Sequence, residues 1–553
     1  MVARVLQGAG ASLLGLGLAG YGVLVTLVAP ISTRVFYDPA LQYMLASLEV
    51  FRGATYSYVD HPGTPVEMLG TLGLALMYPF VSGAPEGFVA YQLGHPAQFM
   101  TMAQTFLAVA SIATCGLFVR RAVIVSHWSQ ALAAVGLGGA FFGLHTAALS
   151  TLAIWSHTSF CFLGGTLLLL ATLVTVRQPK GPRWRAVLAL GFACGVLTSV
   201  QLYFAAWVVG TAVTITLAAR LHGLATRHAL RRGEMTIVLA VVGFVVATLP
   251  IHDRYLGFAS WVVQLSTHQD LYGRGPDGFS SPERLVSNTL TLVQQQPLLF
   301  AVTAATLVFA LVRILRSSAV SVRAAGAGLA IQTVVLLVLV AKHPASRYLL
   351  PVAATVPVLL AALLETSDPP AIAWRRFAAA VGVAGIVLFA QALWTAGKTH
   401  VDVADALRRD DSAMGVWLDR IASQRGIDRQ SLQTLWTYGT TSPCYALWYG
   451  AGSTENLFTN DIGQVCPHDG SLDIAEAHIR SASNDVDVGS AFDWDVEVIP
   501  RNLLNAYPRA RLPGDVYETE LASVTPVDYA AIASDARQPD QHRARALVLI
   551  VRH

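Results

Sequence analysis

Apolar segments long enough to cross a membrane alternate with short polar connections over the first 395 residues. The first run covers residues 11–30, and a helix needs about 20 apolar residues to cross a bilayer. Further runs of this length, or nearly so, cover residues 66–82, 98–119, 130–147, 150–176, 186–200, 202–219, 235–251, 297–315, 324–341, 349–364 and 377–395. Backbone groups in lipid must be satisfied locally, so these runs are predicted to be helices. The pattern predicts a mostly α, polytopic membrane bundle of about 11–13 spans.

Basic residues between these segments predict the orientation of the chain. By the positive-inside rule, clusters of Lys and Arg mark cytoplasmic connections. Four clusters fit one side if the helices alternate: Arg177, Lys180, Arg183 and Arg185; Arg220, Arg227, Arg231 and Arg232; Arg313, Arg316 and Arg323; and Arg375 with Arg376. Residues 252–290, 342–348 and everything after about 396 would then face outward.

One basic pair conflicts with this alternation. Two simple crossings after an outward-facing opening loop would place Arg120 and Arg121 outside. Either the run at 66–82 is not a full span, or the pattern hides another one.

The chain changes character at residue 396, where polar and turn-forming residues become frequent. We therefore divide it into a transmembrane domain (1–395), with a first outer loop at 31–65, and an outward soluble domain (396–553). Apolar residues at helical spacing predict an amphipathic helix over 401–424. Strand-like pieces at 432–438 and 546–551 favour an α/β arrangement of the second domain.

Composition and cysteine positions narrow the class of protein. Hydrophobic residues make up 54% and charged residues 13%, whereas soluble proteins carry about 25% charged residues. The net charge of +3 is spread over short clusters, which argues against a nucleic-acid partner. Cys115, Cys161 and Cys194 lie in apolar runs as packing residues. Cys444 and Cys466 lie in the polar part and can form a disulfide if it faces an oxidising compartment.

The opening loop carries acids at the predicted membrane surface. Asp38 follows the first helix by a few residues, and a carboxylate there can act as a general base. An ordinary loop acid or a helix cap before Pro39 is the alternative. Asp60 and His61 precede a Pro-Gly turn and the next apolar run, where capping and catalysis both remain open. Glu67 either contacts substrate or only complements the helix dipole.

Two further sets of ionisable residues lie near apolar segments. Lys342, His343 and Arg347 fall within six residues on the predicted outer side, where bound anions would explain them. Interfacial anchoring is the alternative. His157 starts an apolar run, and an ionisable residue in a membrane is a functional candidate. A neutral histidine hydrogen-bonded between helices is equally consistent with its position.

Other catalytic motifs are weak or missing. Asp485 with Asp487 and Asp493 with Asp495 show the Asp-x-Asp spacing of nucleotide-sugar transferases. They follow no Rossmann-like pattern and lie on the side opposite to nucleotide sugars. The sequence contains no Walker loop or nucleophile elbow, which argues against an ATP-driven transporter.

Three motifs together resemble a known family. They are Asp38 with Tyr43 five residues later, the segment YVDHPGTP (58–65), and the segment KHPASRYLLPVAATVP (342–357). In this order, the chain resembles the GT-C superfamily of integral-membrane glycosyltransferases, especially the branch of the protein O-mannosyltransferases and lipid A aminoarabinose transferases. The resemblance implies transfer of a sugar from a polyprenyl-phosphate donor to a glycan, lipid or protein acceptor, with inversion.

The resemblance also implies roles for individual residues and a location. Asp38 would deprotonate the acceptor at the periplasmic face of the bacterial inner membrane, the side that also holds the C-terminal domain. Donor phosphate would contact His61, Lys342, His343 and Arg347, while substrate would contact Tyr43, Tyr58, Asp60, Glu67, His157 and Tyr348. No cofactor is certain, and a divalent metal ion, if present, would use Asp38, Asp60 and His157.

Two departures from the family pattern put a metal-assisted mechanism in doubt. Pro39 stands where many members have Glu, and His157 stands roughly where many have another Asp. A transporter or flippase of a lipid-linked or anionic substrate is the main alternative, since about 12 helices also suit secondary transport. An assembly protein with an inactive membrane domain is the third class.

Overall fold

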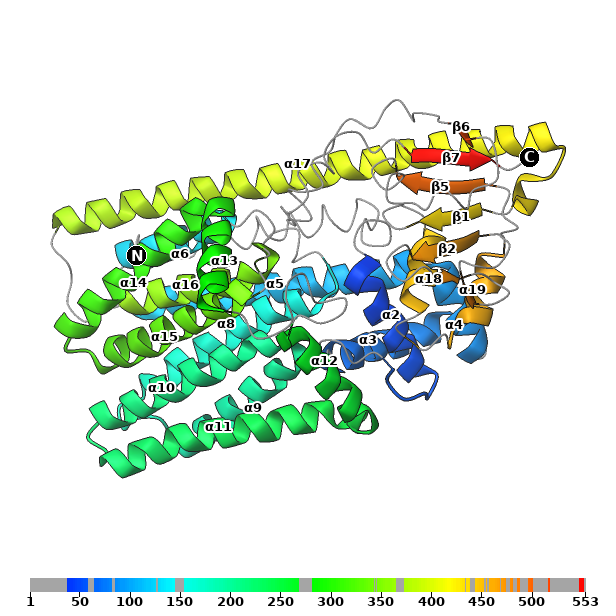
Figure 1. The fold of residues 1–553 in the computed structure, drawn as a ribbon. Coiled ribbons are helices and arrows are strands. Elements are labelled where there is room, and N and C mark those ends of the chain that lie inside the picture. The colour runs from blue at the N-terminus through cyan, green and yellow to red at the C-terminus, as the bar shows by residue number, and fades with distance from the viewer. Residues whose placement is uncertain are drawn as a thin grey trace.

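The computed structural model describes residues 37–57, 64–81, 85–125, 128–144, 154–267, 281–342, 344, 346–364, 372–432, 434–437, 443–451, 454 and 457–467, and the strands that follow. Most of these residues are helical, and the helices form an elongated bundle (Figure 1). The predicted mostly α architecture is confirmed for this part of the chain.

Seven helices among the described residues are long and apolar enough to cross a membrane. These spans include all or part of α5 (Pro96–Val125), α8 (His157–Val176), α10 (Ala205–Leu221), α11 (Thr226–Thr248), α14 (Pro297–Arg316), α15 (Val320–Lys342) and α17 (Ile372–Arg425). Three shorter helices also coincide with predicted runs: α6 (Trp128–Leu144), α9 (Trp184–Val200) and α16 (Leu350–Leu363). A membrane protein is thus supported. Residues 11–30 lie outside the described residues, so the total number of spans stays a prediction.

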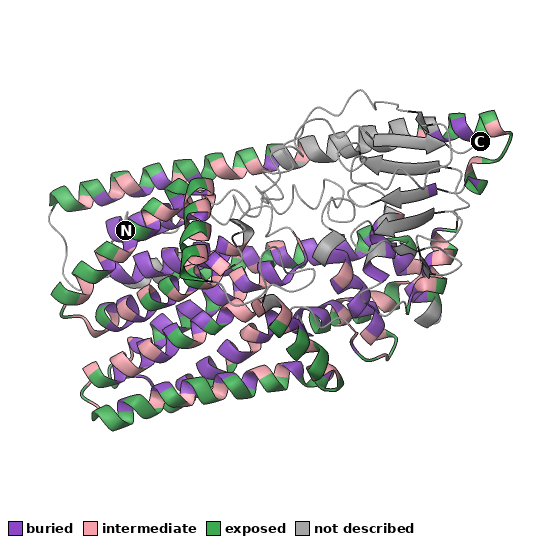
Figure 2. Cartoon of the chain, viewed as in Figure 1, coloured by how far each residue is buried: buried purple, intermediate pink, exposed green. Residues whose placement is uncertain are grey.

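Central and peripheral helices differ in burial. Helices α8, α10, α15 and α16 are mostly buried, whereas α11, α14 and α17 expose much of their surface (Figure 2). From Ile237 onward the exposed positions of α11 are apolar, including Val238, Val241 and Val245. Such a face is typical of a helix that contacts lipid.

Small residues allow the closest helix crossings. A Cβ atom on Gly136 of α6 would collide with the backbone of Gly382 in α17, and one on Gly143 would meet Ala392. The two helices therefore run parallel from Gly136–Gly382 to Gly143–Ala392. Small residues at such crossings permit close backbone packing between membrane helices.

The four basic clusters and the Arg120–Arg121 pair lie at one end of the bundle, here called the basic end. Arg232 of α11 donates to the Pro182 carbonyl between α8 and α9, and Arg313 of α14 donates to the Leu363 carbonyl at 3.0 Å. Helices α6 and α17 are parallel and begin at the same end. The Arg120–Arg121 pair, just before α6, therefore shares an end with Arg375 and Arg376.

The prediction of a span at 66–82 is wrong, and its correction removes the conflict over Arg120 and Arg121. This segment forms α3 (Thr64–Met77), which is followed by η2 (Tyr78–Phe80) and α4 (Pro85–Gly94). Helix α3 has 14 residues, about 21 Å at 1.5 Å per residue, and it is not among the candidate spans or the shorter apolar helices of the described residues.

The predicted outer loop 31–65 contains a helix, α2 (Tyr37–Phe51). Its acidic and aromatic residues suggested a loop, but Leu41, Met44, Leu45 and Leu48 recur at helical spacing and are buried. Helical segments also fill the longer connections: η3 (Leu202–Phe204), η4 (Leu249–Arg254), α12 (Tyr255–Thr267), α13 (Pro282–Gln295) and η6 (Ser346–Leu349).

The boundary placed at 395/396 falls inside α17, which continues to Arg425 without a break. Beyond it lie η7 (Arg429–Ser431), β1 (Thr434–Thr437), α18 (Pro443–Ala451), α19 (Thr459–Val465), β2 (Asp469–Asp473), β3 (His478–Arg480), β4 (Asp485–Asp487), β5 (Val496–Pro500), β6 (Val516–Tyr517) and β7 (Leu547–Val551). The sheet order is β4-β3-β2-β1-β5-β7-β6. Strand β1 is parallel to both neighbours, and the other pairs are antiparallel. The separation into two domains and the independence of an α/β unit stay predictions.

Candidate functional site

The predicted site residues on α2, α8, α15 and η6 lie at the end of the bundle opposite to the basic end, here called the polar end. It comprises α2, the first turn of α8, η3, the last turn of α15 and η6. Helices α8, α10 and α16 start here and run to the basic end, whereas α15 starts at the basic end and finishes here.

A buried hydrogen bond joins α2 to α8. The Tyr43 hydroxyl lies 3.0 Å from Nδ1 of His157, and the two rings meet edge to face. Ser156 caps α8, because its side chain accepts from the Ser159 amide. The structure therefore brings together two predicted site residues that are 114 positions apart.

Two further contacts continue this arrangement towards η6. One turn after His157, the Cys161 thiol donates to Oε1 of Gln201 at 2.9 Å. Tyr203 in η3 packs against Tyr348 in η6, with ring centroids 5.4 Å apart. These contacts place Tyr348 on the same face of the bundle as α8 and η3. Gln201 and Tyr203 were not predicted, because nothing in their spacing distinguishes them from helix-end residues.

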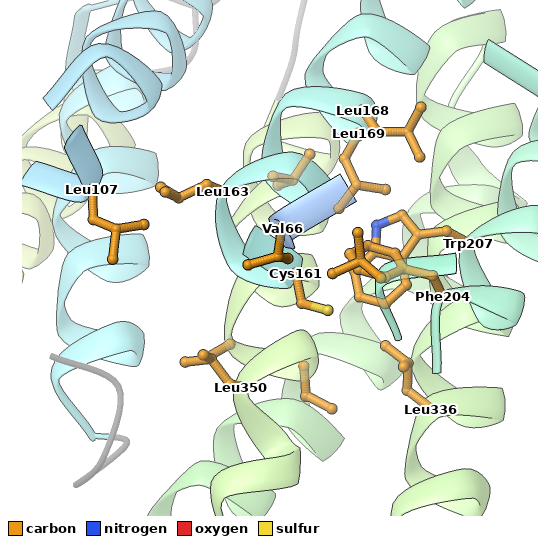
Figure 3. Close-up of a cluster of buried hydrophobic side chains, with 14 of the residues drawn as sticks. Val66, Leu107, Cys161, Leu163, Leu168, Leu169, Phe204, Trp207, Leu336 and Leu350 are labelled. Atoms are coloured by element: carbon orange, nitrogen blue, oxygen red, sulfur yellow. The ribbon is translucent and has the colours of Figure 1, made fainter. Parts of the chain in front are cut away.

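Below these polar contacts lies an apolar cluster. Figure 3 shows Val66 of α3, Cys161 of α8, Phe204 of η3 and Leu350 of α16 gathered with further leucines. Dense apolar packing keeps helix ends in fixed positions. The polar end thus rests on a packed layer to which α3, α8, α10 and α16 all contribute.

Lys342 is held at the end of α15 by a neighbouring helix. Its ammonium donates to the Ser266 carbonyl of α12 at 2.7 Å. The amide of Asn288 in α13 donates to the Ala341 carbonyl at 2.8 Å. Both bonds connect the predicted outer connection 252–290 to the end of α15. The bond to Ser266 also orients Lys342, which is predicted to contact the donor phosphate.

Glu49, Tyr56 and Glu67 form a buried group at the junction of α2 and α3, here called the acid cluster. The Glu49 carboxylate accepts bonds from the amide of Ser57, at 3.1 Å, and from its hydroxyl. Glu67 is completely buried, and neither carboxylate oxygen has a hydrogen-bond partner in the structure that is described.

The two acids of this cluster differ in their electrostatic surroundings. Burial, and then the charge of Glu49, raise the pKa of Glu67 well above its usual value. Burial and the two acids also raise the pKa of Tyr56. Two donors contact the Glu49 carboxylate. The Glu67 carboxylate has none among the described residues, so burial favours its neutral form. A neutral Glu67 does little to complement the helix dipole, which disfavours that alternative.

Sequence reasoning found Glu67 but missed Glu49 and Tyr56. The available signal was an acid at a core position of the apolar pattern LASLEVF (45–51), because a buried acid needs a specific partner.

Several predicted site residues are not covered by the described structure. Tyr58, Asp60, His61 and His343 lie outside the described residues. Asp38 lies in the first turn of α2 and Arg347 lies in η6, but their side chains lie outside the described part.

The optional metal site stays a prediction. The described residues contain no group of three or more His, Cys, Asp or Glu side chains arranged to hold a metal ion. Of the three proposed ligands, only the side chain of His157 is described, and its Nδ1 contacts Tyr43.

The structure joins Cys444 and Cys466 in a disulfide, the pairing that the sequence made conditional on an oxidising compartment. The bridge connects α18 to the residue after α19. Cys115, Cys161 and Cys194 are free thiols within helices.

Comparisons with known proteins identify no relative. No protein-family model matches the chain, and no curated protein or solved structure matches it either.

Proposed function

We propose that the chain is an integral-membrane glycosyltransferase that transfers a sugar from a polyprenyl-phosphate donor to an acceptor, with inversion. One observation carries the proposal. The helix that bears Asp38, the His157 end of α8, Lys342 and the η6 segment that bears Arg347 all belong to the polar end. A lipid-linked substrate would present its phosphate and sugar at such a surface while its chain stays among the lipids.

The chemistry needs one base and fixed positive charge. Asp38 takes the proton of the acceptor hydroxyl as the acceptor oxygen attacks the anomeric carbon. The bond from that carbon to the phosphate oxygen breaks, and its electron pair leaves with the phosphate. Lys342 and Arg347 stabilise the negative charge that develops there. Attack from the face opposite to the leaving group inverts the anomeric carbon.

Orientation follows from the same charges. If the basic end faces the cytoplasm, as the positive-inside rule predicts, the polar end faces outward. In a bacterial inner membrane the transfer then takes place on the periplasmic side. The disulfide between Cys444 and Cys466 supports this orientation, because such bonds persist in oxidising compartments.

A transporter or flippase is the competing proposal. Transporters typically bind substrate near the middle of the membrane. In the described spans, charged residues lie near helix ends, while polar residues in the interior include Gln332, which donates to Thr355 at 3.0 Å. This distribution favours chemistry at the surface over transport through the bundle.

Replacing Asp38 tests the proposal directly. We expect Asp38→Asn to lower transfer from polyprenyl-phosphate sugars by about 100-fold or more, the typical contribution of a general base. Product formation by purified protein in lipid nanodiscs measures this. Asp253→Asn, at an exposed acid in η4, is the matched control and should leave transfer unchanged. Full activity of folded Asp38→Asn would reject the role of Asp38. If the wild type transfers no sugar from any donor, the proposed glycosyltransferase activity is rejected.

A further inference from the structure

The segment 443–466, closed by the disulfide, packs against the helix that bears Asp38. Gly450 of α18 lies so close to α2 that a Cβ atom there would be 2.6 Å from Cδ1 of Leu45 and 4.0 Å from the amide nitrogen of Gln42. The absence of a side chain at Gly450 permits this approach, which places α18 along the middle of α2.

A second contact holds the other end of α2. Arg52, one residue after the helix, donates to Asp461 of α19 at 2.8 Å. The same guanidinium lies 5.9 Å from the centre of the Phe458 ring. Arg52 therefore makes an ion pair with α19 and a cation–π interaction with Phe458, the residue just before it.

The contact region belongs to the main core rather than to a loose surface. Trp448, Phe458 and Ile462 are almost fully buried, and they belong to the same apolar cluster as Met44 and Leu45 of α2. The disulfide links α18 and α19, so both contacts on α2 come from one covalently closed unit.

We propose that segment 443–466 is a clamp that sets the position of α2, and that Arg52 and Asp461 are positioning residues for the transfer reaction. The proposal rests on the function proposed above. From Arg52 to Asp38 the helix is about 20 Å long, so a tilt of about 3° at one end moves the other by about 1 Å. A displacement of about 1 Å at a reacting group can cost about 100-fold in rate.

Two perturbations of the clamp test this inference in the full-length protein in nanodiscs. Arg52→Ala removes the ion pair, and Gly450→Val inserts a side chain between α18 and α2. The double variant Arg52→Asp/Asp461→Arg restores the pair with its charges exchanged. The control is Arg429→Ala, which removes the ion pair of Arg429 with Asp419, 3.7 Å apart, within the C-terminal part.

Hydrogen exchange gives a readout that does not depend on activity. Peptides covering residues 37–51 should exchange at least about 3-fold faster in Arg52→Ala and Gly450→Val than in the wild type, since the contact stabilises the helix. Peptides of α10 should be unaffected. In the charge-exchanged double variant, the exchange rate of these peptides should return towards that of the wild type. In Arg429→Ala it should equal that of the wild type.

Transfer kinetics then test the positioning role. Arg52→Ala should lower kcat about 10-fold or more while KM for the donor stays within about 2-fold, because geometry and not donor affinity is altered. Unchanged exchange in α2 for both clamp variants would overturn the proposal, as would faster exchange with unchanged kcat. If the wild type transfers no sugar, the glycosyltransferase and the positioning role are rejected, but the exchange data still decide whether the clamp holds α2.

Discussion

The interior of the bundle and the surroundings of α2 differ in the buried polar groups that they contain. Between α10, α15 and α16, threonine hydroxyls donate to carbonyls one turn earlier, as in Thr214 to Gly210 and Thr333 to Leu329. At the junction of α2 with α3, the carboxylate of Glu67 has no hydrogen-bond partner among the described residues. At the polar end, the Tyr43 hydroxyl bonds to a histidine on α8. Bonds of the first kind satisfy a hydroxyl within its own helix, whereas a buried carboxylate without a partner carries a cost that a function would explain.

The largest expected effect lies in the bundle. Gly136→Val would place a branched side chain against the backbone of α17, so we expect a loss of folded protein, with a destabilisation of at least about 3 kcal/mol from overpacking. Gly116→Ala in α5, where nothing lies within 4 Å of the added Cβ, is the control. Thermal unfolding in detergent measures both, and equal melting temperatures would contradict the packing argument.

An intermediate effect separates the two regions. Tyr43→Phe removes the buried hydrogen bond to His157. Thr355→Val removes the bond that Thr355 accepts from Gln332, together with the bond that it donates to the Pro351 carbonyl. Each variant should be destabilised by about 1–3 kcal/mol. Only Tyr43→Phe should also lower transfer. Equal losses of activity, corrected for the folded fraction, would show that the polar end has no special role.

The smallest effect concerns pH. Because its pKa is raised in the folded protein, Glu67 stabilises fully below its unfolded pKa of about 4.3. That stability is lost as the pH rises towards the folded value, since the unfolded chain ionises first. Glu67→Gln should therefore lessen the fall in melting temperature between about pH 5 and 8. Exposed Glu283→Gln in α13 should leave the profile close to that of the wild type; an unaltered slope in Glu67→Gln would refute the assignment.

Long apolar runs made most of the bundle predictable. The helices α10, α14 and α15 follow from composition alone, because a run such as that at 324–341 has no other structure available in lipid. The bounds of α3 did not follow, since its apolar residues Met68, Leu72 and Leu76 resemble those of a span but end after four turns.

The candidate site was less predictable than the fold. Single motifs pointed to Tyr43, His157 and Tyr348, but their contacts depend on helix packing over more than 100 residues. The pattern LASLEVF (45–51) indicates that Glu49 is buried, but it does not reveal that Glu49 and Tyr56 lie beside Glu67. Polar residues can be recognised along the chain, whereas their pairing is a property of the tertiary structure.

The length of helix α17 sets the distance and the orientation of the residues that follow it. Its candidate membrane segment ends at Lys398, and the remaining turns to Arg425 add about 40 Å of continuous helix beside which the sheet lies (Figure 1). Each residue removed from such a rod would shorten it by about 1.5 Å and turn everything beyond by about 100°. Removing seven would turn it by only about 20°. Insertions and deletions in this stretch thus act as rotations of the sheet, and those close to whole numbers of turns are the least disruptive.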